Sequence, residues 1–408
     1  MEDVRRYAYP ATEAHTEFQV KEETLEVGQG GQKLFIGIPL ESTMHENRVA
    51  LVPHSVRALT GLGHQVLVQR GAGIKSNFSD HEYSEAGAEV VDSYEEVFKA
   101  QVILKVAPIV EHEIPHLQPN QIIISPLQIP SLTEDYLQQL RQKKIIAVAM
   151  EYLQAEDGSY PIVRIMSEIA GYSAILTAGE LLANTTGGRG VLLGGIAGVP
   201  PAKVVILGAG VVGEFATRTA FSLGASVRIF DDNVYKLMRL QNHLGRQLHT
   251  SSLNPVYLSY QLLSADVVIG AIHSGSGRTP LVVTEEMVSR MKPGTVIIDV
   301  SIDQGGCFET SEITTHERPT FTKYGVIHYC VPNIASKVSR TASVAISNII
   351  TPLLLKAGQA SNFEQLFYAN RGLRHGVYFY KGIATNQYLS RRYNLKYTSL
   401  DLLLTSKW

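Results

Sequence analysis

The stretch KVVILGAGVVGEFATRTAFSLGASVRIFDDN, residues Lys203–Asn233, determines the fold of the region around it. Its apolar run Val204–Leu207 predicts a buried strand, which three glycines and a segment of helical pattern follow. The run SVRIF then predicts a second strand that ends next to Asp231. A strand, a glycine-rich turn, a helix and a second strand in this order predict a unit that binds a dinucleotide.

Gly208, Gly210 and Gly213 give this turn the spacing GxGxxG, and each glycine has its own task. The first makes the tight turn, the second lets a pyrophosphate approach the backbone, and the third lets helix and strand pack closely. The helix N-terminus then offers unpaired N–H groups to the phosphates. Asp231 lies about 20 residues further on, where a carboxylate accepts hydrogen bonds from the ribose hydroxyls and repels a 2′-phosphate. We therefore expect NAD(H) as cofactor, favoured over NADP(H).

Short apolar runs alternate with segments of helical period on both sides of this stretch. The runs are KLFIGIPL, HQVLVQ, QVILKV, QIIIS and KIIAVAM before it, and ADVVIGAI and TVIIDV after it. This alternation predicts parallel sheets covered by helices. We expect an α/β protein with two doubly wound, Rossmann-like parallel-sheet domains and an interdomain cleft, joined by long helices near residues 161–182 and 341–356.

Three divisions of the chain follow from this pattern. Residues 1–32 are polar and lack periodicity, so they are expected to form an N-terminal extension. Residues 33–160 and 342–408 are expected to form a discontinuous substrate (catalytic) domain. Residues 161–341 are expected to form the NAD-binding Rossmann domain.

Composition excludes several classes of function. The chain has 408 residues, 36 Lys+Arg and 38 Asp+Glu, so its charge offers no field to attract nucleic acid. The two cysteines, Cys307 and Cys330, form no CxxC pair, and no His/Cys cluster has zinc spacing, so we expect no metal. The N-terminus has no apolar signal-peptide core, and the apolar stretch 343–355 is shorter than a bilayer span of about 20 residues. We expect a cytoplasmic protein with no membrane partner.

At this point the motifs match a known family. The chain resembles the alanine dehydrogenase and pyridine-nucleotide transhydrogenase family over about residues 33 to 395. The motifs that carry the resemblance are IGIPLESTMHENRVALVP (Ile36–Pro53), ILKV (Ile103–Val106), MSEIAGYSA (Met166–Ala174), GGRGVLLGG (Gly187–Gly195), the fingerprint above and VIIDVSIDQGGCFE (Val296–Glu309). GGRGVLLGG and IDQGGCFE are similar to the alanine dehydrogenase branch. The resemblance also implies a homo-oligomer.

The resemblance implies roles for individual residues. Arg48 is expected to clamp the carboxylate of a 2-oxo acid or amino acid, a task that suits a bidentate guanidinium. Asp303 is expected to close over the nicotinamide and handle protons, and Asn333 to line the substrate side of the cofactor. Ser167 is expected to contact the cofactor. Ile272 and Val300 follow strands whose ends face the dinucleotide, and they are expected to contact the cofactor.

Two positions depart from the family pattern. An ungapped count places the family's second substrate-binding lysine on Ala107 and its catalytic histidine on Gln128. Glutamine has no titratable group near pH 7, and loss of general acid–base help costs a factor of about 10²–10⁴ in rate. His273, after the strand ADVVIGAI, is a candidate substitute on the nicotinamide side.

Three functions remain open from the sequence. The first is an NAD-dependent oxidoreductase that resembles alanine dehydrogenase, converting L-alanine, NAD+ and water to pyruvate, ammonia and NADH, with activity or substrate altered by Ala107 and Gln128. The second is a catalytically weak or silent NAD(H)-binding sensor or regulatory protein. The third is the soluble NAD(H)-binding component of a transhydrogenase, although the Arg-Gln-Asp loop of that branch is absent from YPIVRIMSEIAG.

Overall fold

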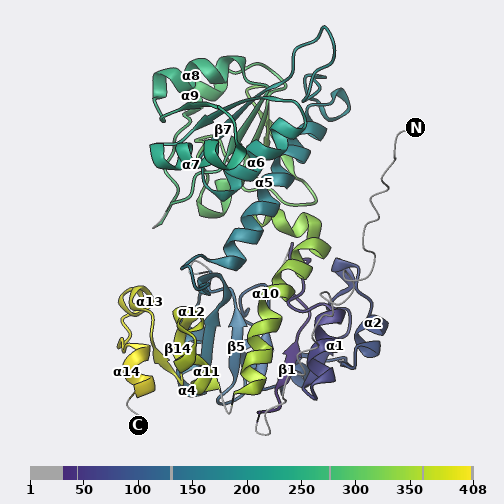
Figure 1. Ribbon diagram of the computed structural model, residues 1–408, viewed down its shortest axis with the longest axis vertical. Helices are drawn as coiled ribbons and strands as arrows, with labels where there is room; N and C mark the ends of the chain where they lie inside the picture. Colours follow the sequence, from purple (N-terminus) through teal and green to yellow (C-terminus); the bar gives the residue numbers. More distant parts are fainter. Residues whose placement is uncertain (1–30, 44, 129–131, 275–276, 361–362, 406–408) are drawn as a thin grey trace, which may run out of the picture.

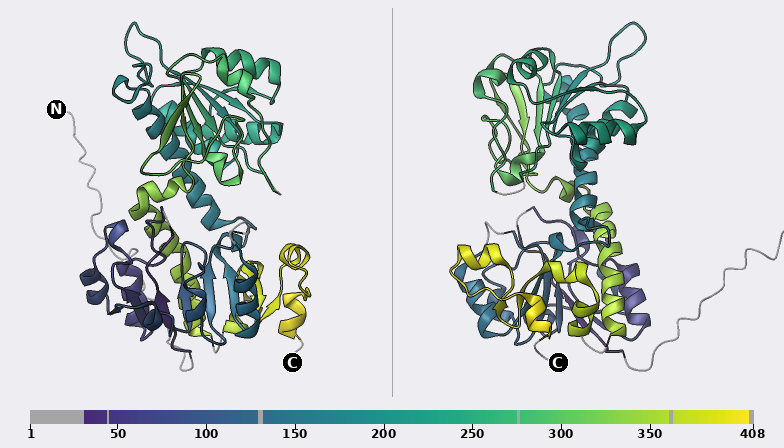
Figure 2. Two further views of the ribbon diagram at one scale, coloured as in Figure 1. Left: turned by 180° about the vertical axis from the view of Figure 1, so that it is seen from behind. Right: turned by 60° about the vertical axis from the view of Figure 1, so that its left-hand side comes forward.

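The computed structural model describes residues 31–43, 45–128, 132–274, 277–360 and 363–405. Nearly all of the expected extension 1–32 therefore lies outside the described residues. Figure 1 shows two lobes, with the long helices α5 (Pro161–Leu181) and α10 (Ser339–Gln359) at their junction. Lobe 1 contains the sheet that includes β1, and lobe 2 contains the sheet that includes β7. The two further views in Figure 2 show the same division. This arrangement confirms the expected α/β fold with two sheets.

Lobe 1 is built on an eight-stranded sheet of order β15-β14-β6-β5-β4-β1-β2-β3. Its strands are β1 (Phe35–Ile38), β2 (Gln65–Gln69), β3 (Glu89–Val91), β4 (Val102–Leu104), β5 (Ile122–Ser125), β6 (Ile146–Ala149), β14 (Val377–Tyr380) and β15 (Ile383–Ala384). The first six strands pair in parallel, as their alternation with helical segments predicts. The C-terminal part of the chain returns to this sheet, because β14 pairs with β6.

Helices cover both faces of this sheet. They are α1 (Pro53–Gly61), α2 (Asp80–Glu85), α3 (Tyr94–Val97), α4 (Glu134–Gln142), α11 (Phe363–Ala369), α12 (Arg371–Gly376), α13 (Gln387–Arg392) and α14 (Leu400–Thr405), with the 3-10 turns η1 (Ile74–Ser76), η2 (Ile114–His116) and η4 (Met150–Tyr152). Local sequence fixes where several begin, because Ser79 and Ser93 each form a capping box and Thr133 caps α4.

Lobe 2 is built on a seven-stranded sheet of order β12-β13-β11-β10-β7-β8-β9. Its strands are β7 (Lys203–Leu207), β8 (Ser226–Phe230), β9 (His249–Ser251), β10 (Val267–Gly270), β11 (Val296–Asp299), β12 (Thr320–Lys323) and β13 (Val326–Tyr329). Its helices are α6 (Val211–Ser222), α7 (Val234–Leu244), α8 (Pro255–Ser264) and α9 (Glu285–Ser289), with η5 (Asn184–Thr186), η6 (Val300–Gln304) and η7 (Ile334–Val338).

Each sheet has an antiparallel edge, so both are mixed rather than wholly parallel. β12 pairs with β13, and β15 with β14, in hairpins closed by the pairs Tyr324-Gly325 and Lys381-Gly382. Both residues of each pair have positive φ, with values of 54° and 73° in the first and 48° and 80° in the second. This conformation is the tight hairpin turn that matches strand twist, and two residues can connect only antiparallel strands.

The two sheets share one order of strands along the chain. In each, the first strand of the lobe lies between its second strand and a later one, so a reversal occurs beside β1 and beside β7. Ligands of doubly wound sheets bind beyond the carboxyl ends of the strands at this switch point. Ligand sites are therefore expected beyond the carboxyl ends of β1 and β4 in lobe 1 and of β7 and β10 in lobe 2.

Helix α10 is longer than the apolar stretch expected from the sequence. In the described part of the chain, one helical run, Ile334–Gln359, is long and apolar enough to cross a membrane by length and composition alone. Ile346, Ile350 and Leu354 of this run are buried in the core of lobe 1. Packing against the sheet of lobe 1 therefore accounts for the apolar character of these positions.

Candidate active site

The glycine-rich turn lies at the switch point of lobe 2. A β-carbon on Gly208 would lie 2.3 Å from the carbonyl oxygen of Ala271, which follows β10, so the turn packs directly against the neighbouring strand end. A β-carbon on Gly213 would lie 1.9 Å from the Gly208 carbonyl oxygen, so α6 packs tightly on β7. A β-carbon on Gly210 would meet nothing within 4 Å. The open space beside Gly210 fits the approach of a pyrophosphate.

Asp231 fastens this turn to the start of α7. Its Oδ2 accepts the backbone N–H of Ala209 at 2.7 Å, and its Oδ1 accepts that of Asn233 at 2.8 Å. The side chain is buried, and the ammonium of Lys236 lies 4.0 Å from Oδ2. Because each carboxylate oxygen has a second lone pair, Asp231 can still accept from a ribose hydroxyl. The residues present therefore fit a dinucleotide.

Ile272 and Val300 are half-buried at the same edge of the sheet. The Ile272 N–H donates to the Ser301 hydroxyl at 3.0 Å, and Val300 begins η6 directly after β11. Ile272 packs against one core cluster of lobe 2 and Val300 against another. Both side chains thus have a packing role, and their contact with a cofactor stays a prediction.

Arg48 lies at the junction of the lobes, in an ion pair with Glu46. The Arg48 Nε and Nη2 donate to the two Glu46 carboxylate oxygens at 2.7 Å and 2.6 Å. Nη1 points at the thioether sulphur of Met166 on α5, 3.2 Å away. The arginine side chain is 10% exposed and that of Glu46 is 4% exposed. Burial alone would lower the pKa of Arg48, but Glu46 raises it above its usual value, so the guanidinium stays charged.

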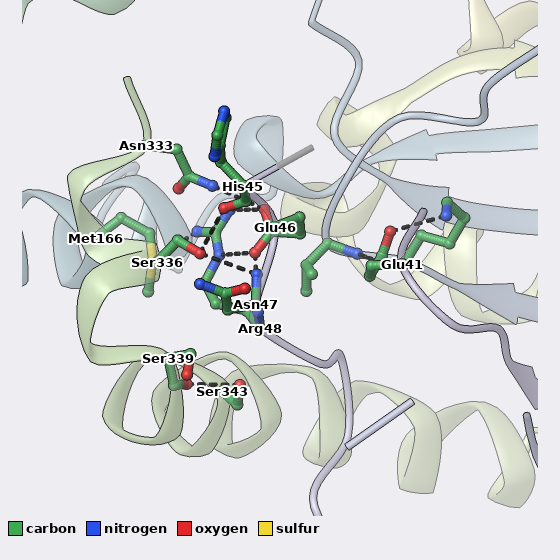
Figure 3. A network of polar contacts seen from close by, with 12 residues as sticks. Glu41, His45, Glu46, Asn47, Arg48, Met166, Asn333, Ser336, Ser339 and Ser343 are labelled. Atoms are coloured by element: carbon green, nitrogen blue, oxygen red, sulfur yellow. Dashed lines mark hydrogen bonds and ion pairs between the residues drawn. The ribbon is translucent and has the colours of Figure 1, made fainter. Parts of the chain in front are cut away.

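Asn333 joins this pair to lobe 2. Its side-chain Nδ2 donates to Glu46 at 2.9 Å, and its backbone N–H donates to Asp303 Oδ1 at 3.2 Å. The backbone of Asn333 is left-handed, with φ of 56°, which turns the side chain and the N–H in different directions. Figure 3 shows Glu46 between Arg48 and the Asn333 amide. Arg48, Asn333 and Asp303, predicted separately from the sequence, are therefore brought together through Glu46.

Asp303 lies in η6, at the lobe 2 side of this network. The residue is exposed to solvent, and its carboxylate faces the Asn333 N–H and the charge of Arg48. Burial raises the pKa of Asp303, and the Asn333 N–H and the Arg48 charge counteract part of that rise. A carboxyl group whose pKa is raised and which faces a cation is suited to exchanging protons.

Hydroxyl groups of η7 and α10 hold the segment that carries Arg48. The Asn47 N–H donates to Ser336 Oγ at 2.9 Å, and the Val49 N–H donates to Ser343 Oγ at 3.0 Å. The Ser336 hydroxyl donates in turn to the carbonyl oxygen of His45 at 2.8 Å. Figure 3 shows Ser336 next to His45 and Asn47. The arginine therefore comes from an irregular segment that a distant helix keeps in place.

Lys105, Glu41 and Glu113 occupy the switch point of lobe 1. The Lys105 ammonium donates to Glu41 Oε2 and to Glu113 Oε1, both at 2.8 Å, and all three side chains are buried. Glu41 also accepts the N–H of Val106 at 2.6 Å. Burial raises the pKa of Glu41, although Lys105 counteracts it, and the two glutamates raise the pKa of Lys105. The Lys105 ammonium is thus paired with two glutamates of lobe 1.

Comparison with known proteins identifies the family. The model of the alanine dehydrogenase/PNT N-terminal domain matches residues 37–170, and that of the C-terminal domain matches residues 174–387. The chain belongs to the alanine dehydrogenase/PNT family. The resemblance stated from the sequence motifs is thereby confirmed.

Individual members of the alanine dehydrogenase/PNT family are similar over nearly their full length. Alanine dehydrogenase 2 of Staphylococcus aureus strain USA300 is 39% identical over 367 residues, which cover 90% of this chain and 98% of the relative. A solved L-alanine dehydrogenase superposes with a TM-score of 0.82 at 35% identity, over 88% of this chain and 99% of that one. A solved transhydrogenase from Sinorhizobium meliloti gives 0.72 at 26% identity, over 86% and 99%.

The two departures from the family pattern lie in lobe 1. Ala107 is buried beyond β4, two residues after Lys105. Gln128 is exposed beyond β5, with φ of 37°, where its backbone bonds to the carboxylate of Glu151. Burial raises the pKa of Glu151. Position 107 therefore supplies no cation, and position 128 supplies an amide that does not titrate.

The candidates His273 and Ser167 lie outside the Arg48 network. His273 is exposed three residues beyond β10, and no polar contact within the described residues joins it to Arg48. Ser167 is half-buried on α5, next to Met166, whose sulphur Arg48 contacts. Within the described ranges, no group of three His, Cys, Asp or Glu side chains could hold a metal ion.

Sequence reasoning missed Glu46, His45 and His316. Glu46 stands two residues before Arg48 in the quoted motif, and a carboxylate that close to a predicted buried arginine was a usable signal. The rings of His45 and His316 lie 5.9 Å apart, with His316 bonded to the backbone of Asn333. Because these histidines are 271 positions apart in the printed sequence, only the fold brings them together.

Proposed function

We propose that this chain is an NAD(H)-dependent dehydrogenase of the alanine dehydrogenase type, which interconverts L-alanine or a similar small amino acid with its 2-oxo acid and ammonia. The observation that carries the proposal is the buried Arg48 guanidinium, held by Glu46 and joined through Asn333 to Asp303 of the other lobe. The similarity to alanine dehydrogenases over most of the chain supports the same reaction class.

Arg48 is suited to bind the substrate carboxylate. Glu46 accepts from Nε and Nη2 of the guanidinium, while Nη1 contacts the sulphur of Met166, a weak acceptor. An incoming carboxylate would replace that sulphur and form charge-assisted hydrogen bonds to the guanidinium. Glu46 holds the guanidinium plane, so the substrate meets a donor that is already oriented.

The dinucleotide would be held by Gly208, Gly210 and Gly213 along its pyrophosphate and by Asp231 at its ribose. Bound NAD+ supplies the acceptor for the hydride of the substrate. Asp231 supports a preference for NAD(H), because a buried carboxylate would repel a 2′-phosphate. Asp303, with its raised pKa, is suited to hold a proton at the face that lobe 2 turns to Arg48.

A weak or silent NAD(H)-binding protein is the second candidate. It is favoured by Ala107 and Gln128, which contribute neither a cation nor a titratable group. A soluble transhydrogenase component has less support, because the similarity to the transhydrogenase structure is lower in both identity and TM-score. We further propose that the protein acts in the cytoplasm as a homo-oligomer without nucleic acid or membrane partners.

The deciding experiment is NADH oxidation by the purified protein with pyruvate and ammonium, beside an NADH-binding titration. We expect turnover, a large rise in the pyruvate KM for Arg48→Ala, and unchanged NADH affinity in that variant. Arg57→Ala, at an exposed position of α1, is the matched control and should leave both quantities unchanged. An unchanged pyruvate KM in Arg48→Ala would remove Arg48 from the site.

The double variant Ala107→Lys/Gln128→His separates the two leading candidates. If NADH binds but the natural protein turns nothing over, and activity appears in the double variant, the second candidate is correct. Turnover by the natural protein means that other groups replace the missing lysine and histidine.

A further inference from the structure

Conversion of an amino acid to an oxo acid needs a proton carrier near the substrate carboxylate. Imidazole is the side chain whose unperturbed pKa suits this task near neutral pH. The structure brings two imidazoles to the Arg48 network, those of His45 and His316, with ring centroids 5.9 Å apart in an edge-to-face arrangement.

His316 is built into the network through Asn333. Its imidazole is hydrogen-bonded to the backbone of Asn333, whose side chain reaches Glu46 and whose N–H reaches Asp303. The His316 Nε2 is buried and has no hydrogen-bond partner within the described residues. A buried ring nitrogen without a partner costs free energy, which a second group can recover when it arrives.

His45 is presented by a strained segment. Its backbone is left-handed, with φ of 68°, and its carbonyl oxygen accepts the Ser336 hydroxyl. A non-glycine residue in this conformation costs of order 1–3 kcal/mol and persists where the surroundings enforce it. Figure 3 shows the His45 ring on the same side of the Glu46–Arg48 pair as the Asn333 amide. The ring is half-buried and therefore still reachable from solvent.

We infer that the His45–His316 pair is the proton-transferring device of this site, with His45 the group that meets the substrate and His316 the residue that positions it. This inference rests on the proposed function. The exposed His273 has no polar contact with Arg48 in the described residues.

The step assigned to His45 is hydrolysis of the carbon–nitrogen double bond that remains once the amino acid has been oxidised. Water adds its oxygen to the iminium carbon, and its proton passes to the imidazole. The protonated ring returns that proton to nitrogen, and as the carbon–nitrogen bond breaks the hydroxyl proton passes to the imidazole. Ammonia and the oxo acid are released, and the ring gives its proton to solvent. Carbon keeps its oxidation level, and the imidazole ends as it began.

Several charges surround the pair. His316 faces His45, Lys337 and Glu46, while Arg48 and Asp303 face each other across the adjoining contact. Burial lowers the pKa of His316, and the neighbouring His45 and Lys337 lower it further, whereas the Asn333 backbone and Glu46 raise it. His316 is therefore a neutral hydrogen-bonding partner near neutral pH, which suits a positioning role.

The test is the pH profile of kcat in His45→Gln and His316→Gln, with NADH affinity as a check on fold and cofactor site. We expect His45→Gln to lose a factor of about 10²–10⁴ in kcat and the pH inflection of the natural protein, with NADH affinity kept. His316→Gln should shift that inflection and cost less. Free imidazole should restore part of the activity of His45→Ala.

A matched control is His81→Gln, since the side chain of His81 is 80% exposed on α2. A natural protein without turnover would remove the proposed function, and this inference with it. Turnover that keeps its pH profile in both His45→Gln and His316→Gln would overturn the inference alone. Loss of turnover in His273→Gln only would transfer the role to that residue and overturn the inference as well.

Discussion

The switch points of the two sheets are formed by the same order of strands but are filled differently. In lobe 2 the crevice beside β7 carries Gly208 and Gly210, and the space beside Gly210 is open. In lobe 1 the crevice beside β1 is filled by the buried Lys105 with Glu41 and Glu113. The topology provides two equivalent crevices, and side chains decide which one can take a nucleotide.

The comparison also explains where the candidate substrate site lies. Because Lys105 and its glutamates block the first crevice, polar groups for a ligand gather outside it, at Arg48 and at Asn333. Because the charged groups at the lobe 1 switch point are buried and paired with one another, we expect them to affect the stability of that lobe rather than recognition of a ligand.

The largest expected effect comes from removing the ammonium of the lobe 1 cluster. Lys105→Met would leave Glu41 and Glu113 buried without their cation, which costs about 3–5 kcal/mol in the free energy of unfolding. Urea unfolding followed by circular dichroism measures it. The triple variant Lys105→Met/Glu41→Gln/Glu113→Gln should recover most of that loss. Equal stability of Lys105→Met and the natural protein would contradict the stabilising role of the cluster.

Two glycines of the lobe 2 turn should separate stability from binding. Gly213→Ala places a β-carbon 1.9 Å from the Gly208 carbonyl oxygen, so α6 must shift, at a cost of about 1–3 kcal/mol. Gly210→Ala meets nothing within 4 Å and has φ of −75°, so it should fold normally yet bind NADH at least about tenfold more weakly. Thermal unfolding and NADH fluorescence titrations measure both. Unchanged NADH affinity in Gly210→Ala would show that the open space is not the pyrophosphate site.

A smaller effect is expected at the ribose end of the same crevice. Asp231→Ser removes the charge that repels a 2′-phosphate and leaves Lys236 close by, so the preference for NADH over NADPH should fall by about tenfold or more. The measurement is the ratio of the two dissociation constants. Asp232→Ser is the matched control, because Asp232 is exposed, and should keep the natural ratio. A ratio that stays constant in Asp231→Ser would remove Asp231 from cofactor selection.

The smallest effect concerns acid sensitivity, because His328 in lobe 2 and His64 in lobe 1 are histidines with little solvent exposure. Burial lowers the pKa of His328 in lobe 2 and, together with Lys33, that of His64 in lobe 1. Their stabilising neutral forms are present above about pH 6.5, and stability falls below it, by at most about 1.4 kcal/mol per pH unit for each group. Since His328 is 0% exposed and His64 7%, His328→Gln should flatten the acid branch of the unfolding curve more than His64→Gln. A steeper acid branch in His328→Gln would contradict this sign.

Most of the fold could be predicted from the sequence, because apolar runs and glycines act locally. The runs around β1, β2, β4, β5, β6, β7, β8, β10 and β11 all form the expected strands. The hairpins at Tyr324-Gly325 and Lys381-Gly382 were not predicted, although the second residue of each turn is a glycine, which tolerates positive φ. Three-residue edge strands such as β3 and β9 also escaped, because three residues are too few for a period to emerge.

Less of the candidate site was accessible to sequence reasoning. The family motifs placed Arg48, Asp303 and Asn333, but their mutual contact depends on Glu46 and on the fold. His316 comes from an irregular segment without period, so no pattern linked it to His45. The pairing of Lys105 with two buried glutamates could not be predicted either, because burial and pairing are tertiary properties.

The hydroxyl stripe of α10 limits how this protein can be recombined with its relatives. Ser343 and Ser347 accept the backbone N–H groups of Val49 and Val52, across almost 300 positions of sequence. A chimera that exchanges only the N-terminal family segment, residues 37–170, would part the Arg48 segment from the helix that supports it. A chimera with a relative should therefore take residues 37–170 and 339–359 from the same parent, so that both partners of these hydrogen bonds stay together.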